Sequence, residues 1–172
     1  MTAGPSDVEI REERPDDVRA VRDVNREAFG RGDEACLVDA LREGGGVTLA
    51  LVAVSGDAVV GHILFSPLVV GESVGAALAP MAVRPRFQRR GIGSRLVTRG
   101  LEELRRRGCP YVVVLGHPAF YPRFGFEPAG PLGVTCEWSV PAEAFLVRVL
   151  EPQVRDGLGG RAVYRPEFSL VT

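Results

Sequence analysis

The stretch VRPRFQRRGIGSRLV, Val83–Val97, sets five arginines and two glycines between two apolar segments. Pro85 ends a strand-like run, and from Gly91 to Gly108 apolar residues recur at helical spacing. The first turn of a helix carries unpaired N–H groups and the positive end of the helix dipole, and glycine there lets an anion approach the backbone. The stretch therefore predicts a phosphate-binding loop between a strand and a long helix.

Two common phosphate motifs do not fit this loop. The chain contains no lysine, so a Gly-x-x-x-x-Gly-Lys loop is excluded, and Leu96 stands where a dinucleotide fingerprint has its third glycine. The fragment by itself is equally compatible with a glycine-containing loop whose arginines are merely solvated. Motifs elsewhere in the chain are needed to distinguish a phosphate-binding loop from a solvated one.

Length and composition indicate one globular domain of 1–172, with a core of about 8–150 and a tail, 151–172, whose role is open. The net charge of −1 argues against general attraction to nucleic acid. Three scattered cysteines and two isolated histidines give no metal-ligand spacing, so no metal is expected. No apolar run is long enough for a signal peptide or a membrane span, so we expect a cytoplasmic protein without membrane contact.

The hydrophobic pattern indicates an α/β protein of α+β layers, with one mixed sheet. A continuous apolar hairpin broken at Ser55-Gly56-Asp57 is typical of strands covered on both faces. The expected strands are 8–12, the two arms of 47–70, 75–83, 111–116 and 144–150; the expected helices are 17–29, 33–43 and 91–108.

Two motifs carry a resemblance to a known family. The pattern Val-x-Pro-x-x-Gln-x-x-Gly-Ile-Gly-Ser, Val83–Ser94, resembles the acetyl-CoA pyrophosphate loop of the GNAT superfamily of N-acyltransferases. Downstream, FYPRFGF, Phe120–Phe126, is similar to a segment that follows the fifth strand in these enzymes, and its surroundings resemble a subgroup of small bacterial predicted acetyltransferases. The resemblance covers about 8–150. It implies a GNAT fold: a mixed, mostly antiparallel sheet splayed between strands 4 and 5, with helices on both faces.

The resemblance also implies which residues bind acetyl-CoA. Backbone groups of Met81 and Val83 would hold the pantetheine arm, and Gln88 belongs to the loop motif. The pyrophosphate would lie on the loop and the helix start, with the arginines supplying charge, at Arg89, Arg90, Gly91, Ile92, Gly93 and Ser94. Pro80 cannot donate a ladder hydrogen bond, so we expect an edge or a bulge there.

The chemistry implied is transfer of an acetyl group from acetyl-CoA to a primary amine, by direct attack through a tetrahedral intermediate, with a backbone N–H near Val83 as oxyanion donor. Tyr121 matches the tyrosine that acts as general acid in many members, although it could equally pack in an aromatic cluster. The strand 75–83 has no acid, so the candidate base is His117, with a water relay as the rival. His62 is expected to be structural.

Several alternatives stay open at this stage. A catalytically silent acyl-CoA sensor could use the same fold, and Arg84–Arg107 could form a nucleic-acid-binding surface. The acceptor could be a small-molecule or peptide amine, and a homodimer is possible. Acidic residues in the regions expected to bind the acceptor suit a cationic amine: Glu27, Asp33, Glu34, Asp39, Glu43 and Glu137.

Overall fold

The computed structural model describes residues 7–171. Its helices are α1 (Val18–Phe29), α2 (Asp33–Glu43) and α3 (Ile92–Arg106). Its strands are β1 (Val8–Glu12), β2 (Leu49–Ser55), β3 (Ala58–Val70), β4 (Ser73–Val83), β5 (Tyr111–Leu115), β6 (Glu127–Pro128), β7 (Val134–Thr135), β8 (Phe145–Val149) and β9 (Gly160–Val163). The three helices and the six longer strands expected from the sequence are confirmed, with ends shifted by a few residues.

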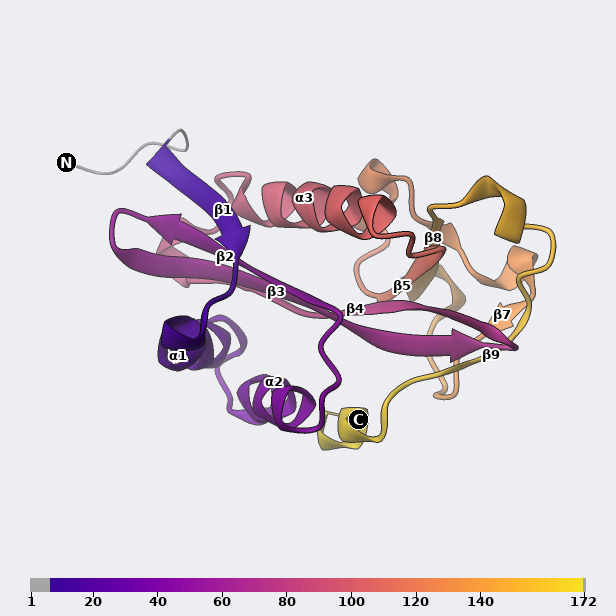
Figure 1. Ribbon diagram of the computed structural model, residues 1–172, viewed down its shortest axis with the longest axis horizontal. Coiled ribbons are helices and arrows are strands. Elements are labelled where there is room, and N and C mark those ends of the chain that lie inside the picture. Colours follow the sequence, from indigo (N-terminus) through magenta and orange to yellow (C-terminus); the bar gives the residue numbers. More distant parts are fainter. Residues whose placement is uncertain (1–6, 172) are drawn as a thin grey trace.

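The strands form one sheet in the order β1-β2-β3-β4-β5-β8-β6, with β9 added against β3 and β7 against β9. The pairs along this order are antiparallel except β4 with β5, which is parallel. Figure 1 shows α3 on one face of the sheet and α1 and α2 on the other. The predicted mixed, mostly antiparallel sheet with helices on both faces is therefore confirmed.

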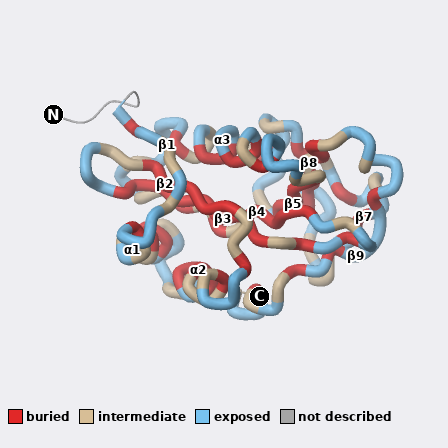
Figure 2. Tube along the Cα trace, viewed as in Figure 1, coloured by how far each residue is buried: buried red, intermediate tan, exposed pale blue. Residues whose placement is uncertain are grey.

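The middle of the sheet is buried on both faces, as the continuous apolar pattern of the hairpin predicts (Figure 2). One apolar cluster lies under α3 and includes Ile63, Phe65 and Leu96, and a second lies under α1 and α2. At Gly100 of α3, an added Cβ would stand 2.5 Å from the Phe65 ring. A glycine at this position therefore lets the long helix lie directly on the sheet.

Strands β4 and β5 separate after a short paired stretch. They pair only from Ala76 to Leu78, and β4 then continues to Val83. Beyond this point the β3–β4 register places two β4 residues, Ala79 and Pro80, opposite one β3 residue, Leu64. The predicted bulge at Pro80 and the predicted splay of the two strands are both present, and the splay opens the sheet at its centre.

The chain after 150, whose role was open from the sequence, returns to the sheet. β9 pairs with β3 through Val69↔Val163, and the short helical turn Pro166–Leu170 packs on α2 (Figure 1). Arg165 donates to the carbonyl of Gly44 at 3.0 Å, which fastens the tail to the end of α2. The tail thus covers the α2 side of the molecule.

His62 lies fully buried on β3 and contacts α1 through Asn25, at 3.2 Å between the Asn25 Nδ2 and His62 Nδ1 atoms. Asn25 Nδ2 also donates to the Val21 carbonyl, which orients the amide so that His62 Nδ1 is an acceptor. Burial, with a smaller effect of Arg42, lowers the pKa of His62 from 6.5 to about 3. His62 is therefore neutral in the folded protein, in keeping with the structural role expected for it.

This burial makes folding stability depend on pH. In the unfolded chain His62 takes up a proton below its ordinary pKa of 6.5, whereas the folded protein resists protonation down to about pH 3, so the unfolded state gains as pH falls. Between pH 7.5 and 5 we expect His62 to reduce the free energy of unfolding by about 2 kcal/mol. Urea unfolding of the parent and of His62→Gln at both pH values measures this loss of stability, which should be smaller in His62→Gln. Equal losses in the two proteins would contradict the assignment.

Candidate functional site

The loop before α3 has the backbone conformation expected of an anion site. Gly91 is the residue preceding the helix and has φ of 82°, and Arg89 also has a positive φ, 61°. A Cβ added to Gly91 would meet no atom within 4 Å among the described residues, so its surroundings are open. Open space, a left-handed glycine and a helix N-terminus together fit a phosphate group.

A cavity of about 450 Å³ lies along this loop. Of the predicted cofactor residues, those that line it are Met81, Val83, Gln88, Arg89, Gly91, Ile92, Gly93 and Ser94. Arg90 does not line it, and its guanidinium lies 5.7 Å from the ring centre of Phe87 instead. Gln88 donates from its amide to the Val83 carbonyl at 2.9 Å, so this side chain ties the loop to the end of β4.

The arginines of the segment Arg84–Arg107 differ in their ion-pair partners. Arg84 is paired with Glu27 of α1 and donates to the Val59 carbonyl, while Arg106 and Arg107 pair with Glu103. Ion pairs therefore occupy both ends of the basic segment Arg84–Arg107. These ion pairs argue against the nucleic-acid-binding surface that the sequence left open. Arg86 and Arg89, in contrast, are exposed near the start of α3.

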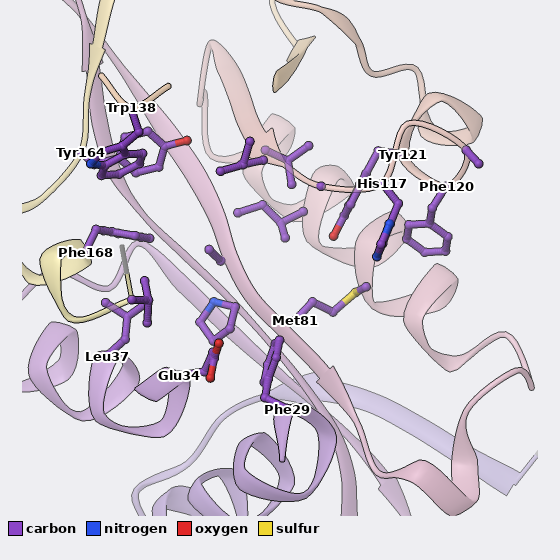
Figure 3. Close-up of a pocket in the computed structure, with 18 of the residues that line it drawn as sticks. Phe29, Glu34, Leu37, Met81, His117, Phe120, Tyr121, Trp138, Tyr164 and Phe168 are labelled. Atoms are coloured by element: carbon purple, nitrogen blue, oxygen red, sulfur yellow. The ribbon is translucent and has the colours of Figure 1, made fainter. Parts of the chain in front are cut away.

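A larger cavity, of about 920 Å³, fills the opening between β4 and β5 (Figure 3). Leu78, Pro80 and Met81 line it from β4, and Val114 lines it from β5. It also shares lining residues with the loop cavity: Met81, Gln88, Arg89, Phe120 and Arg123. The two cavities therefore lie next to each other, with these five residues between or beside them.

The two predicted catalytic residues both line the larger cavity. His117 is exposed, and its carbonyl accepts hydrogen bonds from the backbone of Phe120 and Tyr121. Tyr121 is 7% exposed, and burial raises the pKa of its phenol to about 12. Figure 3 shows the Tyr121 hydroxyl directed toward the cavity interior and His117 beside it. A phenol with this pKa keeps its proton at neutral pH and can donate it.

Aromatic packing fixes the Tyr121 ring. It meets Phe120 and Phe126 edge to face, with ring centres 5.0 and 5.6 Å apart. The aromatic cluster that the sequence offered as an alternative role for Tyr121 is thus present, and it does not remove the hydroxyl from the cavity. Its ring also lies against the backbone of Gly116, where an added Cβ would stand 2.3 Å from Tyr121 Cε2.

The far side of the larger cavity contains Glu34, one of the acids expected near the acceptor, and three aromatic residues to which the sequence assigned no role. Glu34 of α2 is 6% exposed and its carboxylate accepts hydrogen bonds from Arg31 Nε at 3.0 and 3.1 Å. The Tyr164 ring lies between those of Trp138 and Phe168, tilted against the first and edge to face with the second, with ring centres 4.7 and 5.0 Å apart. Of the acids expected near the acceptor, Glu34 is the one among the described residues that lines this cavity.

The described residues 7–171 contain no group of three or more His, Cys, Asp or Glu that could hold a metal ion. Within the same range no helix is both long and apolar enough to cross a bilayer. The cysteines are all unpaired thiols, with Cys36 exposed and Cys109 and Cys136 half-buried.

Comparison with known proteins places the chain in a family. The profile of the acetyltransferase (GNAT) family matches residues 13–126. The chain is 38% identical over 163 residues to the uncharacterized N-acetyltransferase YhbS of Escherichia coli, covering 93% of this chain and 98% of that one. It is 41% identical over 134 residues to the uncharacterized N-acetyltransferase YjhQ of the same organism, covering 74% of each chain.

Two solved structures share the whole arrangement. The crystal structure of YhbS from E. coli in complex with CoA superposes with a TM-score of 0.89 at 38% identity, over 94% of this chain and 92% of that one. A GNAT family acetyltransferase from Brucella melitensis in complex with acetyl-CoA gives a TM-score of 0.80 at 34% identity, over 94% and 97%.

The contact between Gly116 and Tyr121 generates a prediction. Gly116→Ala places a methyl group where the Tyr121 ring lies, so the ring must move, and we expect a loss of about 1–3 kcal/mol in the free energy of unfolding. Gly130→Ala is the matched control, because a Cβ at Gly130 meets nothing within 4 Å. Denaturant unfolding measures the loss, and near-ultraviolet circular dichroism reports the tyrosine environment. Equal stability of the two variants would show that the ring adapts freely.

Proposed function

The chain belongs to the acetyltransferase (GNAT) family, and we propose that it moves an acetyl group from acetyl-CoA to a primary amine by direct attack through a tetrahedral intermediate. The observation that carries the proposal is the adjacency of the two cavities at the β4–β5 opening, with Tyr121 lining the larger one next to the shared residue Phe120. Acetyl-CoA supplies an activated thioester, so the chain's own residues have to bind, orient and move protons.

The binding role falls to the loop before α3. Its fit to the pyrophosphate rests on the open space at Gly91, the N-terminus of α3 and the exposed Arg86 and Arg89. The unpaired edge of β4 beyond Leu78 offers backbone groups at Met81 and Val83 to the amide-containing arm. In this proposal Arg90 contributes charge at a distance, because it lines neither cavity.

Proton movement falls to Tyr121 and His117. The thiolate that leaves needs a proton, and Tyr121 is protonated at neutral pH and faces the cavity. The attacking amine has to lose a proton, since an ammonium has no free electron pair. We assign that step to His117, either directly or through water that it orients, because His117 lines the same cavity.

The cofactor proposal is tested at Gly91. Gly91→Glu adds bulk and negative charge where the phosphates are expected, so acetyl-CoA affinity should fall by at least about tenfold. Gly91→Asn is the matched control: asparagine tolerates a positive φ and is neutral, so it should retain more of the affinity. Titration calorimetry measures both. Equal affinity of Gly91→Glu and the parent would remove the loop from the site.

The role of Tyr121 is tested by turnover. Tyr121→Phe keeps the ring and its packing, so acetyl-CoA affinity should stay unchanged while kcat falls by about 10²-fold or more. Because the pKa of Tyr121 is raised to about 12, its proton is retained up to about pH 11, and the parent should show no loss of kcat from tyrosine ionisation below that pH. Steady-state release of CoA thiol across pH measures both. An unchanged kcat in Tyr121→Phe would exclude it as the general acid.

Other expectations from the sequence stay predictions. A homodimer and a cytoplasmic location belong to this group. A silent acyl-CoA sensor would bind acetyl-CoA as proposed but release no CoA with any amine, so the turnover assay separates it from the enzyme.

A further inference from the structure

We propose that the acceptor is a small primary amine that carries an aromatic ring on a short linker, bound with its ammonium at Glu34 and its ring against Trp138, Tyr164 and Phe168. This inference rests on the proposed acetyl transfer and names the substrate class of the same site. We call the part of the larger cavity lined by Phe29, Glu34, Leu37, Trp138, Tyr164 and Phe168 the acceptor chamber.

The order of groups across the cavity sets the orientation. In Figure 3, His117 and Tyr121 lie on one side of the cavity, the aromatic wall of Trp138, Tyr164 and Phe168 lies on the opposite side, and Glu34 lies along a third side beside Phe29. The acetyl group would arrive from the Tyr121 side, so in this proposal the ammonium rests against Glu34 with its nitrogen toward Tyr121. The remainder of the molecule then points to the aromatic wall.

The charges favour a single ammonium group. Glu34 is the one acid among the described lining residues of the larger cavity, and Arg31 already donates to both of its oxygens. A carboxylate has further lone pairs, so it can accept from one more donor. The other charged lining residues include Arg89 and Arg123, which would repel additional positive charges. A polyamine or an aminoglycoside carries several ammonium groups, and this cavity offers only one carboxylate among its described lining residues to bind them.

The walls favour an aromatic group. Trp138, Tyr164 and Phe168 form a continuous row of tilted and edge-to-face rings, and Phe29 and Leu37 line the same cavity from α1 and α2. Rings in edge or offset contact with such a row gain more than their buried area alone provides. The volume of about 920 Å³ lies in the range of small-molecule sites and must also admit the acetyl-bearing arm. A compact amine fits this space better than a folded protein surface.

The Tyr164 hydroxyl adds a polar contact. Tyr164 is 8% exposed, and its hydroxyl has no hydrogen-bond partner among the described residues. Figure 3 shows this hydroxyl directed toward the chamber. The oxygen itself is covered by neighbouring atoms, so a ligand reaches it only where those atoms shift. Because a buried polar group without a partner is costly, a ligand that does reach it with a hydrogen-bonding group gains affinity. A ring that carries a hydroxyl group, as in tyramine, has such a group at its far end.

Hydrogen bonds and an ion pair hold the segments that carry the aromatic wall in place. Arg165, next to Tyr164, donates to the Gly44 carbonyl and pairs with Glu167. Its side chain lies against the glycines that follow α2: a Cβ at Gly46 would stand 2.4 Å from Arg165 Nε. Glu137 accepts from the Tyr164 N–H at 3.2 Å and so joins the tail to the segment of Trp138.

The test uses Trp138, the single tryptophan of the chain, as a reporter in the wall itself. Protein that has first been shown to bind acetyl-CoA is titrated with four amines, and Trp138 fluorescence is followed. The amines are phenethylamine, tyramine, butylamine and spermidine. The same amines are then compared as acceptors by CoA release. We expect phenethylamine and tyramine to have KM values at least about tenfold below those of butylamine and spermidine.

Three variants and one control variant separate the contacts. Glu34→Gln should weaken phenethylamine binding about tenfold, while Glu43→Gln, on an exposed residue of the same helix that does not line the cavity, should leave it unchanged. Trp138→Leu should raise KM for phenethylamine and not for butylamine, with acetyl-CoA affinity retained. Tyr164→Phe should abolish any preference for tyramine over phenethylamine.

Failure of this inference and failure of the proposed function give different results. Acetylation of butylamine or spermidine as efficient as that of phenethylamine overturns the inference and leaves the transferase in place. Equal effects of Glu34→Gln and Glu43→Gln overturn the assignment of Glu34. Absence of acetyl-CoA binding, or binding with no CoA release for any amine, overturns the proposed function, whereas Trp138 quenching by phenethylamine would still support the chamber.

Discussion

The structure depends on the point at which β4 and β5 stop pairing. Buried backbone N–H and C=O groups require partners, and a sheet normally supplies them strand by strand. After Leu78 the edge of β4 that faces β5 has no strand partner among the described residues, and the bulge at Ala79 and Pro80 follows directly. The sheet therefore has an open seam at its centre, and both cavities are bounded by it. A ligand with amide groups can complete the ladder there.

The charges of this protein are balanced overall, so their effects are confined to particular sites. The chain has a net charge of −1, and ion pairs distribute its arginines over the surface, as with Arg11–Asp17, Arg42–Glu13 and Arg155–Glu127. At the start of α3, a glycine with open space around it, the positive end of the helix dipole and the exposed Arg86 and Arg89 coincide. The opposite end of the seam has a single buried carboxylate, Glu34. In the proposed function and the further inference, the phosphates and the amine would thus bind on two sides of the same opening.

The parts of the fold that could be predicted from the sequence are those with long, regular patterns. The helix from Ile92 and the hairpin strands repeat over enough residues for periodicity to be unambiguous, and the loop motif is contiguous. The short strands β6, β7 and β9 have too few residues for any period. Gly116 is expected to end the strand 111–116, and the sequence cannot show why a glycine is needed there, because the Tyr121 ring that lies against it is placed by tertiary packing. Glu34 was one of six candidate acids, and only the fold distinguishes it from the others.

The two halves of the site are encoded differently, and this has a consequence for specificity. The loop at Gly91 is local, so its geometry follows from a few neighbouring residues. The aromatic wall joins Trp138 to the tail at Tyr164 and Phe168, and the tail in turn depends on Arg165 reaching the glycines after α2. Substitutions in the tail can therefore change the acceptor without disturbing the donor loop, whereas a side chain at Gly46 would displace Arg165 and move the whole wall. The glycine triplet after α2, which reads in the sequence as a simple helix stop, thus supports the site from a distance.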